Sequence, residues 1–291
     1  MPNKHHPRRG SLQYWPRKRA ARAFARLRSW RQSTTLPAFI GYKAGMTHMI
    51  VKDNSPHTIY KNQDLSIPVT VIECPPLKTL SLRFYKKSYQ SKIMIAEIFS
   101  KNISKELKKY IVLPKTEAKE PTDFDEIRVK VHTQPHLTGI GKKRPEIIEF
   151  PISGKEKNET LSLAKGLLEK GTIKLQDLFK DHKYVDVHSV TKGKGFQGTV
   201  KRFGVKIRQH KAEKTKRGIG TLGSWHPNKV QYTVAQSGRM GYHQRTEINK
   251  QNILIDSDPT KVNPKAGFLH YGFIKNEYII LKGSIPGPAK R

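Results

Sequence analysis

Short runs of β-branched and aromatic residues recur near both ends of the chain, separated by glycine and proline. Runs of this kind are typical of strands, and a strand–turn–strand rhythm is typical of a barrel or a sandwich. The first run ends in a glycine turn around Gly45, and Pro75 and Pro76 end the N-terminal group. The predicted strands are 39–47, 47–52, 67–73, 184–190, 230–234, 251–255, 267–273 and 277–281.

The middle of the chain, residues 77–181, combines helical and strand periods. Leu161, Ala164, Leu167 and Leu168 follow a helical period, and Gly171 ends it. This region therefore predicts an α+β insertion with a solvated surface in a chain that is otherwise mainly β. Its predicted helical segments are 102–110, 161–170 and 175–179, and its predicted strands are 125–132 and 146–152.

The N-terminal segment has few apolar residues, and prolines at positions 2, 7 and 16 break any early helix. From Arg17 to Arg31, however, Ala20, Phe24 and Leu27 recur at helical spacing. This spacing predicts a short amphipathic helix.

The distribution of charge separates the ends of the chain from its middle, because the basic residues are unevenly placed. The 291 residues include 56 Lys/Arg and 23 Asp/Glu, a net charge of +33, but residues 97–181 contribute only +3. Residues 1–52 hold twelve basic residues and no acid, and 192–217 hold ten with one acid, Glu213. Such segments repel themselves and stay extended until a polyanion neutralises them. Nucleic acid is the expected partner, with an anionic membrane surface or a merely solvated face as the alternatives.

Several function classes are excluded by what the sequence lacks. It has no apolar run of about 18 residues, so no membrane span is expected, and it has no secretory signal core. Cys74 is the one cysteine, which excludes an internal disulfide and fits a reducing compartment. An Arg-rich, acid-poor N-terminus also occurs in mitochondrial transit peptides. We expect this one to be retained as an RNA-coating extension.

A glycine-rich motif at 193–200 matches the G-x-G-x-x-G-x-V pattern of nucleotide-binding loops and follows a predicted strand. A dinucleotide site needs a helix that starts at the third glycine, whereas residues 199–204 are β-branched and glycine-broken and predict none. The downstream motifs of a kinase are also missing. The glycines are better explained by tight turns and close approach of the backbone to RNA phosphate. No cofactor is expected.

The twelve histidines do not form a recognisable catalytic or metal site. Asp186 and His188 share one strand face while Ser189 takes the other, so they cannot converge as a triad. His210 and His243 lie among basic residues and are interpreted as RNA contacts. No metal is expected.

Trp225 follows glycines and precedes a proline, which places it at a loop tip. His226 is expected to position this ring against a turn at Pro227. An exposed ring beside a basic tract can stack on bases while cations meet phosphates. A core position for Trp225 is the alternative.

Taken together, several motifs resemble the family of universal large-subunit ribosomal protein three, the L-three family. The resemblance runs nearly end to end, and the long basic N-terminus and the insertion are similar to the archaeal and eukaryotic form. Further similar segments are 16–20, 41–47, 225–227 and 241–246. The signature residues are Phe179, Asp186, Ser189, Thr191, Gly193, Lys194, Gly195, Gly198 and Arg202.

The resemblance implies a six-stranded Greek-key β-barrel of the translation-protein type, with long basic extensions. It implies a finger, about 204–245, that reaches toward the peptidyl transferase centre with Trp225 at or near its tip. Lys216 stands where eukaryotic members carry a modifiable histidine, so histidine modification is not expected. The implied parts are an N-terminal RNA-binding extension (1–37), two barrel segments (38–76 and 182–282), the insertion (77–181) and a basic tail (283–291).

The implied function is that of a structural, non-enzymatic component of the large ribosomal subunit in the cytoplasm. Its implied partners are large-subunit ribosomal RNA and neighbouring ribosomal proteins, with a role in early assembly and in the access of aminoacyl-tRNA and elongation factors. A nucleotide-dependent enzyme and a general polyanion binder are the rival interpretations. The predicted RNA-binding residues are Arg8, Arg9, Arg17, Lys18, Arg19, Arg22, Lys192, Lys194, Lys201, Arg202, Lys206, Arg208, His210, Lys211, Lys214, Lys216, Arg217, Trp225, His226, Arg239, His243 and Arg245.

Overall fold

The computed structural model describes residues 7–30, 36–53, 57–116, 118–152, 154, 156–212 and 214–291. The chain divides into two compact units. The first, here called the basic unit, comprises the described residues up to Arg26, together with His188–Glu247 and Pro286–Pro288. The second, the core unit, comprises the described residues of Leu27–Val187, Ile248–Ile285 and Ala289–Arg291.

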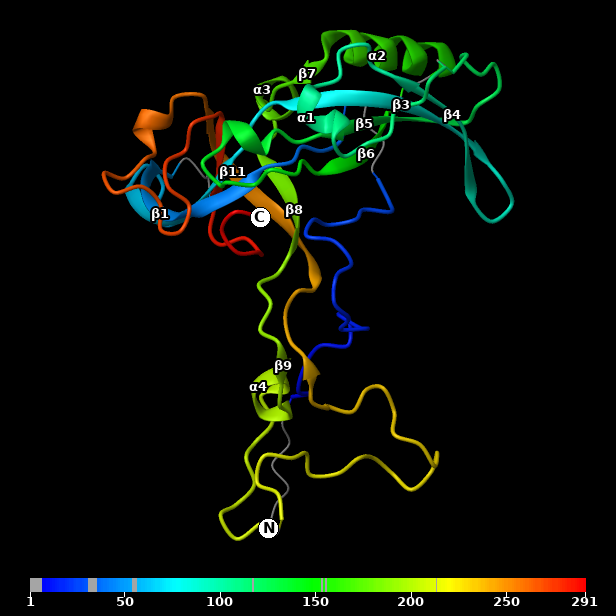
Figure 1. Ribbon diagram of the computed structural model, residues 1–291. Coiled ribbons are helices and arrows are strands. Elements are labelled where there is room, and N and C mark those ends of the chain that lie inside the picture. Colours follow the sequence, from blue (N-terminus) through cyan, green and yellow to red (C-terminus); the bar gives the residue numbers. More distant parts are fainter. Residues whose placement is uncertain are drawn as a thin grey trace. The chain divides into compact units, whose positions relative to one another are not determined.

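The first sheet joins strands from both ends of the sequence (Figure 1). Its order is β1 (Tyr42–Lys52), β2 (Asp64–Glu73), β12 (Tyr278–Lys282), β11 (Gln244–Asp256) and β8 (Tyr184–Val190). The pairs β1–β2, β2–β12 and β12–β11 are antiparallel. The strands predicted over 67–73, 184–190, 251–255 and 277–281 are thereby confirmed. Among the described residues the sheet has five strands and forms no closed barrel, so the six-stranded barrel stays a prediction.

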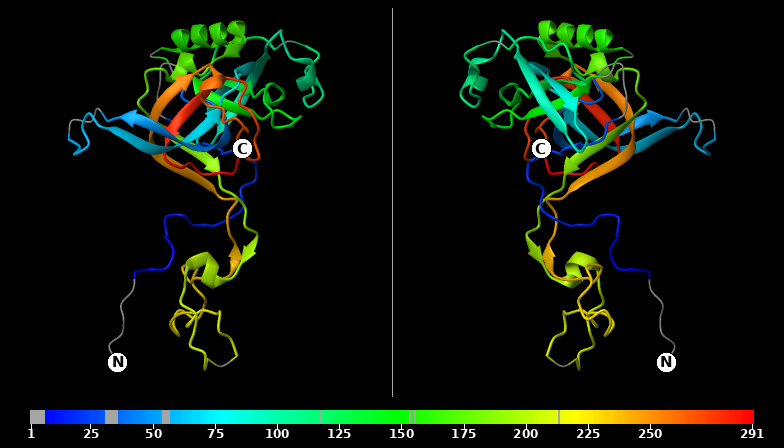
Figure 2. Two further views of the ribbon diagram at one scale, coloured as in Figure 1. Left: turned by 90° about the vertical axis from the view of Figure 1, so that its left-hand side faces the viewer. Right: turned by 90° about the vertical axis from the view of Figure 1, so that its right-hand side faces the viewer.

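The predicted turn at Gly45 is wrong, because β1 runs through this position as one strand. Its register with β2 shifts between Lys43 and Gly45, which marks a β-bulge. A Cβ at Gly45 would lie only 2.7 Å from the ring of Phe268. The glycine therefore lets the Phe268 ring pack close against the strand. Beyond the bulge, β1 and β2 continue as a twisted two-stranded ribbon (Figure 2).

The second sheet lies within the predicted insertion. Its order is β4 (Lys92–Phe99), β3 (Leu77–Lys87), β5 (Glu126–His132) and β6 (Ile147–Ile152), and β7 (Thr172–Ile173) also pairs with β3. The two strands predicted in this region, now β5 and β6, are confirmed. Strands β3 and β4 were not predicted, although the alternation of Leu80, Leu82 and Phe84 is a strand signal.

Helix α2 (Lys157–Lys170) packs against β3, β5 and β6. It confirms the predicted helix, and Gly171 ends it in the left-handed conformation with φ 68°. Helix α3 (Gln176–Phe179) confirms the predicted helical turn. Helix α1 (Lys105–Lys108) is much shorter than the 102–110 prediction. Two 3-10 turns are also present, η1 (Pro135–Leu137) and η2 (Pro259–Lys261).

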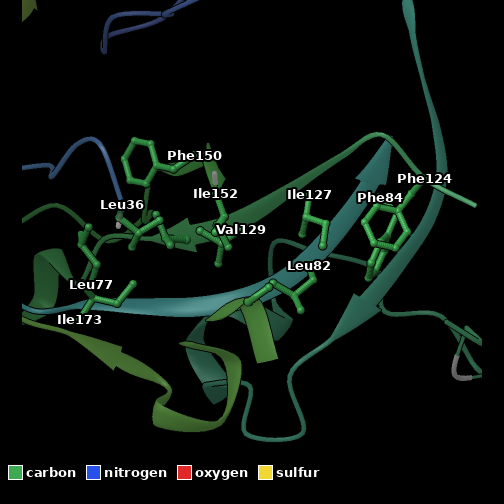
Figure 3. Packing of buried hydrophobic residues seen from close by; sticks show 12 residues of the cluster. Leu36, Leu77, Leu82, Phe84, Phe124, Ile127, Val129, Phe150, Ile152 and Ile173 are labelled. Atoms are coloured by element: carbon green, nitrogen blue, oxygen red, sulfur yellow. The ribbon is translucent and has the colours of Figure 1, made fainter. Parts of the chain in front are cut away.

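The largest apolar cluster of the described residues packs on the second sheet, where Figure 3 shows Leu82 and Phe84 of β3 near Ile127 of β5. Ala164 of α2 belongs to the same cluster. Phe84 packs edge-on against Phe124, with ring centroids 5.3 Å apart, and Trp30 packs edge-on against Phe150 at 5.7 Å. Between Leu82 and Phe84 on β3, Arg83 pairs with Glu97 at 2.9 Å and also with Glu149. Strand β3 thus has a buried face and an opposite face that carries an ion-paired arginine.

Three further predictions are wrong. Residues 230–234 form no strand. Residues 267–273 form none either, because they make a tight turn closed by a Phe268–Gly272 bridge. The described residues of the predicted Arg17–Arg31 helix, which end at Trp30, are irregular. Helical spacing there would put Lys18, Arg22 and Arg26 four residues apart, and like charges at that spacing repel. In the described part of the chain, no helix is long and apolar enough to cross a membrane.

Candidate nucleic-acid interface

The glycine-rich motif builds a two-stranded stem in the basic unit. Its strand β9 (Phe196–Gln197) pairs antiparallel with β10 (Gly238–Arg239). The Lys194 N–H donates to the Met240 carbonyl, and the Met240 N–H donates to the Gly195 carbonyl, each at 2.9 Å. Gly241 has φ +75°, and a Cβ there would lie 2.1 Å from the Lys192 carbonyl oxygen. The stem therefore depends on a backbone approach that only glycine permits.

The absence of a helix after the third glycine was wrongly predicted, because helix α4 (Thr199–Phe203) begins there. Gly198 precedes it, and Gly204 ends it with φ 67°. Thr199 and Phe203 are buried, so tertiary packing outweighs the weak helix propensity of this segment. The flanking strands β9 and β10 are antiparallel, which is not the parallel βαβ unit of a dinucleotide site.

The N-terminal segment is held against the stem by backbone hydrogen bonds. The Ala20 N–H donates to the Tyr242 carbonyl at 2.8 Å, and the Nδ1 of His243 donates to the Lys18 carbonyl at 2.7 Å. The Gln244 amide bonds to both the N–H and the carbonyl of Arg26, at 3.1 and 2.9 Å. These partners hold residues 18–26 in an irregular path with bends at 21–24, which is a further reason why the predicted helix does not form.

An aromatic cluster joins the same segment to α4. Trp15 stacks on Phe203 with ring centroids 6.3 Å apart, and it meets Tyr232 edge-on at 5.7 Å. The guanidinium of Arg17 lies 4.8 Å from the Phe203 ring centroid and 5.5 Å from that of Trp15. Cations over aromatic faces attract the ring electrons, so these contacts fix the arginine while it stays charged.

Most of the predicted RNA-binding residues are exposed. Four arginines are partly buried, namely Arg17, Arg202, Arg208 and Arg245. One of these, Arg208, donates to the carbonyls of Ile219 and Gly220 and so closes its own loop. The exposed residues are Arg8, Arg9, Lys18, Arg19, Arg22, Lys192, Lys194, Lys201, Lys206, His210, Lys211, Lys214, Lys216, Arg217, Trp225, His226 and Arg239.

His243 is the exception, because its side chain is buried with only 6% exposed. Its backbone N–H is also used inside the protein, because it donates to the Thr191 hydroxyl at 3.2 Å. The prediction of an RNA contact from this ring is therefore corrected: His243 ties the N-terminal segment to the stem. The basic neighbours in the sequence carried no information about the Lys18 carbonyl that the ring contacts, because Lys18 is far away in the chain.

The Trp225 ring is 82% exposed, so the alternative of a core position is wrong. Residues 221–230 are all exposed. The Ser224 hydroxyl donates to the His226 carbonyl oxygen at 2.5 Å and tightens the turn before Pro227. A role for the His226 ring in placing Trp225 stays a prediction.

Two exposed aromatic residues of the basic unit were missed by sequence reasoning. Phe196 on β9 is 75% exposed, and Tyr232 is 71% exposed. Both rings are exposed on a strongly cationic unit, which suits stacking on unpaired bases. The signal for Phe196 was available, because it lies between Lys194 and Lys201 in a glycine-rich stretch that cannot bury it.

The basic unit is strongly cationic as a whole. Its stretches of the sequence contain 21 Lys/Arg and two acidic residues, Glu213 and Glu247; Glu213 lies outside the described residues. Within the part of the chain that the structure describes, no group of three His, Cys, Asp or Glu side chains could hold a metal ion. The basic unit thus presents exposed cations and exposed aromatic rings.

Comparison with known proteins agrees with these features. The family model described as Ribosomal protein L3 matches residues 1–119 and 83–291. Three archaeal relatives are named large ribosomal subunit protein uL3. That of Methanocaldococcus jannaschii is 43% identical over 99% of this chain and 90% of its own length. Those of Methanosphaera stadtmanae and Methanothrix thermoacetophila are 44% and 42% identical, over 100% and 99% of this chain and 91% and 89% of their own lengths. The signature at the stem and the match along the whole chain lead to one conclusion: the chain belongs to the ribosomal protein L3 family.

Proposed function

We propose that the protein is a structural constituent of the large ribosomal subunit that binds large-subunit ribosomal RNA through its basic unit. The observation that carries this proposal is the exposed set of cations and aromatic rings on a unit with almost no acids. Phosphate contacts position such a protein, while the shape of the RNA supplies most of the specificity. The protein is structural and not an enzyme, and it works in the cytoplasm beside neighbouring ribosomal proteins.

Finer parts of the proposal rest on the family. The first sheet is proposed to belong to a six-stranded Greek-key barrel, and the parts of the chain to follow the boundaries 1–37, 38–76, 77–181, 182–282 and 283–291. The finger, about 204–245, is proposed to reach toward the peptidyl transferase centre. Early subunit assembly and the access of aminoacyl-tRNA and elongation factors would then depend on it.

Salt dependence of RNA binding tests the proposal directly. Each neutralised phosphate contributes about 0.7–0.9 to the negative slope of log affinity against log salt concentration. A dozen contacts would give a slope of about −8 to −11. We expect large-subunit RNA fragments to outcompete unrelated RNA of equal length at several salt concentrations. Equal affinities throughout would favour a general polyanion binder and overturn the proposal, and tight binding of a free nucleotide would favour the enzyme.

Trp225→Ala tests the role of the finger. Because the ring is exposed, its loss should change the free energy of unfolding by less than about 0.5 kcal/mol. Subunits assembled with the variant should differ from wild type in binding aminoacyl-tRNA or elongation factor. The measurements are denaturant unfolding of the free protein and factor binding by the subunits. Unchanged factor binding would contradict the proposed placement of Trp225, and Lys229→Ala in the same exposed stretch is the control.

A further inference from the structure

Three partly buried arginines gather in the basic unit from separate parts of the sequence. Arg17 belongs to the N-terminal segment, Arg202 to α4 and Arg245 to β11. The guanidinium carbons of Arg17 and Arg202 lie 4.8 and 5.2 Å from the centroid of one phenyl ring, that of Phe203. They are thus within about 10 Å of each other, roughly one Debye length, where their repulsion is little screened.

Their charges have no carboxylate partner among the described residues. The structure describes one acidic residue in the basic unit, Glu247, and no ion pair is found for these three arginines in the described part of the chain. The pKa of Arg17 is lowered by burial and by Arg8, and the pKa of Arg202 is lowered by burial and by Arg17. Burial and Arg17 likewise lower the pKa of Arg245. The described structure therefore holds these like charges near one another with no carboxylate to balance them.

The side chains are nevertheless held in place. Arg17 donates to the Ser11 carbonyl at 2.9 Å, and Arg202 donates to the carbonyls of Gln236 and Arg239 at 2.9 and 3.1 Å. The Tyr14 ring lies 4.3 Å from the Arg245 guanidinium carbon. A guanidinium has five N–H donors, so each arginine keeps donors beyond these bonds. Fixed cations with spare donors are suited to bind an oxyanion.

Two details show that acceptors are missing here. The Nε of Arg17 and the Nε1 of Trp15 are buried without a hydrogen-bond partner in the described structure. An open hollow lies on the N-terminal segment beside Arg17, lined by Arg8, Gly10, Ser11, Leu12 and Gln13. The cluster is thus rich in donors and poor in acceptors, and its three arginines are only partly buried.

We propose that Arg17, Arg202 and Arg245 together bind one phosphodiester group of RNA. This inference rests on the proposed function and deepens it, because it separates one built phosphate site from the many exposed cations that neutralise the backbone singly. The site exists only while the N-terminal segment is docked on the stem, since Arg17 reaches α4 from that segment. Binding of the phosphate therefore fastens the segment.

The test compares two triple variants of the full chain. In the first, Arg17, Arg202 and Arg245 are all changed to Gln; in the control, the exposed residues Arg9, Lys194 and Lys201 are changed to Gln. Both lose three charges. If the three arginines share one phosphate, the slope of log affinity against log salt should become shallower by about 0.7–0.9, whereas three separate contacts in the control should change it by about 2–3. An unchanged slope, or a change equal to that of three separate contacts, would overturn the shared site.

Single and double variants give a second measurement that does not depend on the control. Arg17→Gln and Arg202→Gln should each weaken binding to a large-subunit RNA fragment by about tenfold, and the double variant should lose much less than a hundredfold. Independent losses that multiply would contradict a shared phosphate. Hydrogen exchange of the Lys194 and Met240 amides in each free variant shows whether the stem stays folded. Where a Gln variant opens the stem, the Arg→Lys variant at the same position is measured in its place. Arg→Lys keeps the charge but loses the forked donors, so affinity equal to wild type would also contradict the site.

Failure of this inference can be told from failure of the proposed function. Wild-type protein that does not prefer large-subunit RNA would contradict the function, whatever the variants do. Polyglutamate serves as a probe for an acidic protein partner in place of RNA. If the triple Gln variant loses polyglutamate binding but keeps RNA binding, the cluster serves an acidic chain and the phosphate site is wrong.

Discussion

Glu73→Ala should lower the free energy of unfolding of the core unit by about 3–5 kcal/mol. The carboxylate is fully buried at the end of β2. It accepts hydrogen bonds from the Tyr271 hydroxyl, the Lys275 and Asn276 N–H groups at 2.9 and 3.0 Å, and the Asn276 side-chain amide at 2.8 Å. Alanine would leave all of these donors without an acceptor and would add a cavity.

Glu73→Gln is the matched control. Its amide oxygen can replace the oxygen that accepts from Lys275 and Asn276, and its NH₂ can donate to the Tyr271 oxygen. The shape is kept and the hydrogen bonds become neutral, so a loss of about 1–2 kcal/mol is expected. Denaturant unfolding of both variants measures the difference. If alanine and glutamine lowered the free energy of unfolding equally, the stabilisation would come from the carboxylate charge. Hydrogen-bond acceptors for Tyr271, Lys275 and Asn276 would then contribute nothing.

Gly241→Ala should open the stem of the basic unit, at a cost of about 3–5 kcal/mol. A Cβ would lie 2.1 Å from the Lys192 carbonyl oxygen, and this contact is to backbone, which cannot turn aside as a flexible side chain can. Relief requires separation of the two stem strands. The N-terminal segment is bonded to Tyr242 and His243, so it should loosen with them. Binding to large-subunit RNA should weaken by at least about tenfold as a result.

Gly195→Ala separates the clash from the cost of the left-handed backbone. Gly195 has φ +68°, close to that of Gly241, but a Cβ there meets no heavy atom of the described chain within 4 Å. Only the cost of the left-handed conformation applies, about 1–2 kcal/mol. Hydrogen exchange of the Lys194 and Met240 amides measures the stability of the stem in both variants. Similar protection of these amides in the Gly195→Ala and Gly241→Ala variants would mean that the Lys192 contact relaxes easily, contrary to the prediction.

Predictions from the sequence were confirmed where one strong local pattern sets the structure. The helical period that Gly171 ends became α2, and the β-branched run before Pro75 became β2. The exposure of Trp225 followed from its glycine and proline neighbours. In each case the signal lies within a few residues, so no distant partner had to be known.

The wrong predictions are at positions whose local structure depends on a residue far away in the sequence. A turn was predicted at Gly45, but the residue lies at a bulge inside β1, and the distant Phe268 ring packs close against it. Residues 199–203 predicted no helix, but burial of Phe203 against Trp15 supports one. His243 was read from its basic neighbours, although the Lys18 carbonyl holds its ring inside the stem. More than 180 residues separate Phe203 from Trp15, and a local pattern carries no information over such a distance.

Composition and periodicity are enough to predict a mainly β, strongly cationic chain whose charge lies in its N-terminal segment and around residues 192–217. These properties depend on each residue and its near neighbours. Which cations stay single on the surface and which come together depends on contacts between distant parts of the chain. Arg17, Arg202 and Arg245 look like any other arginine in the sequence. Folding places Arg17 and Arg202 at one phenyl ring, that of Phe203, and Arg245 over Tyr14, and partial burial and mutual repulsion give them a chemistry that the exposed cations do not have.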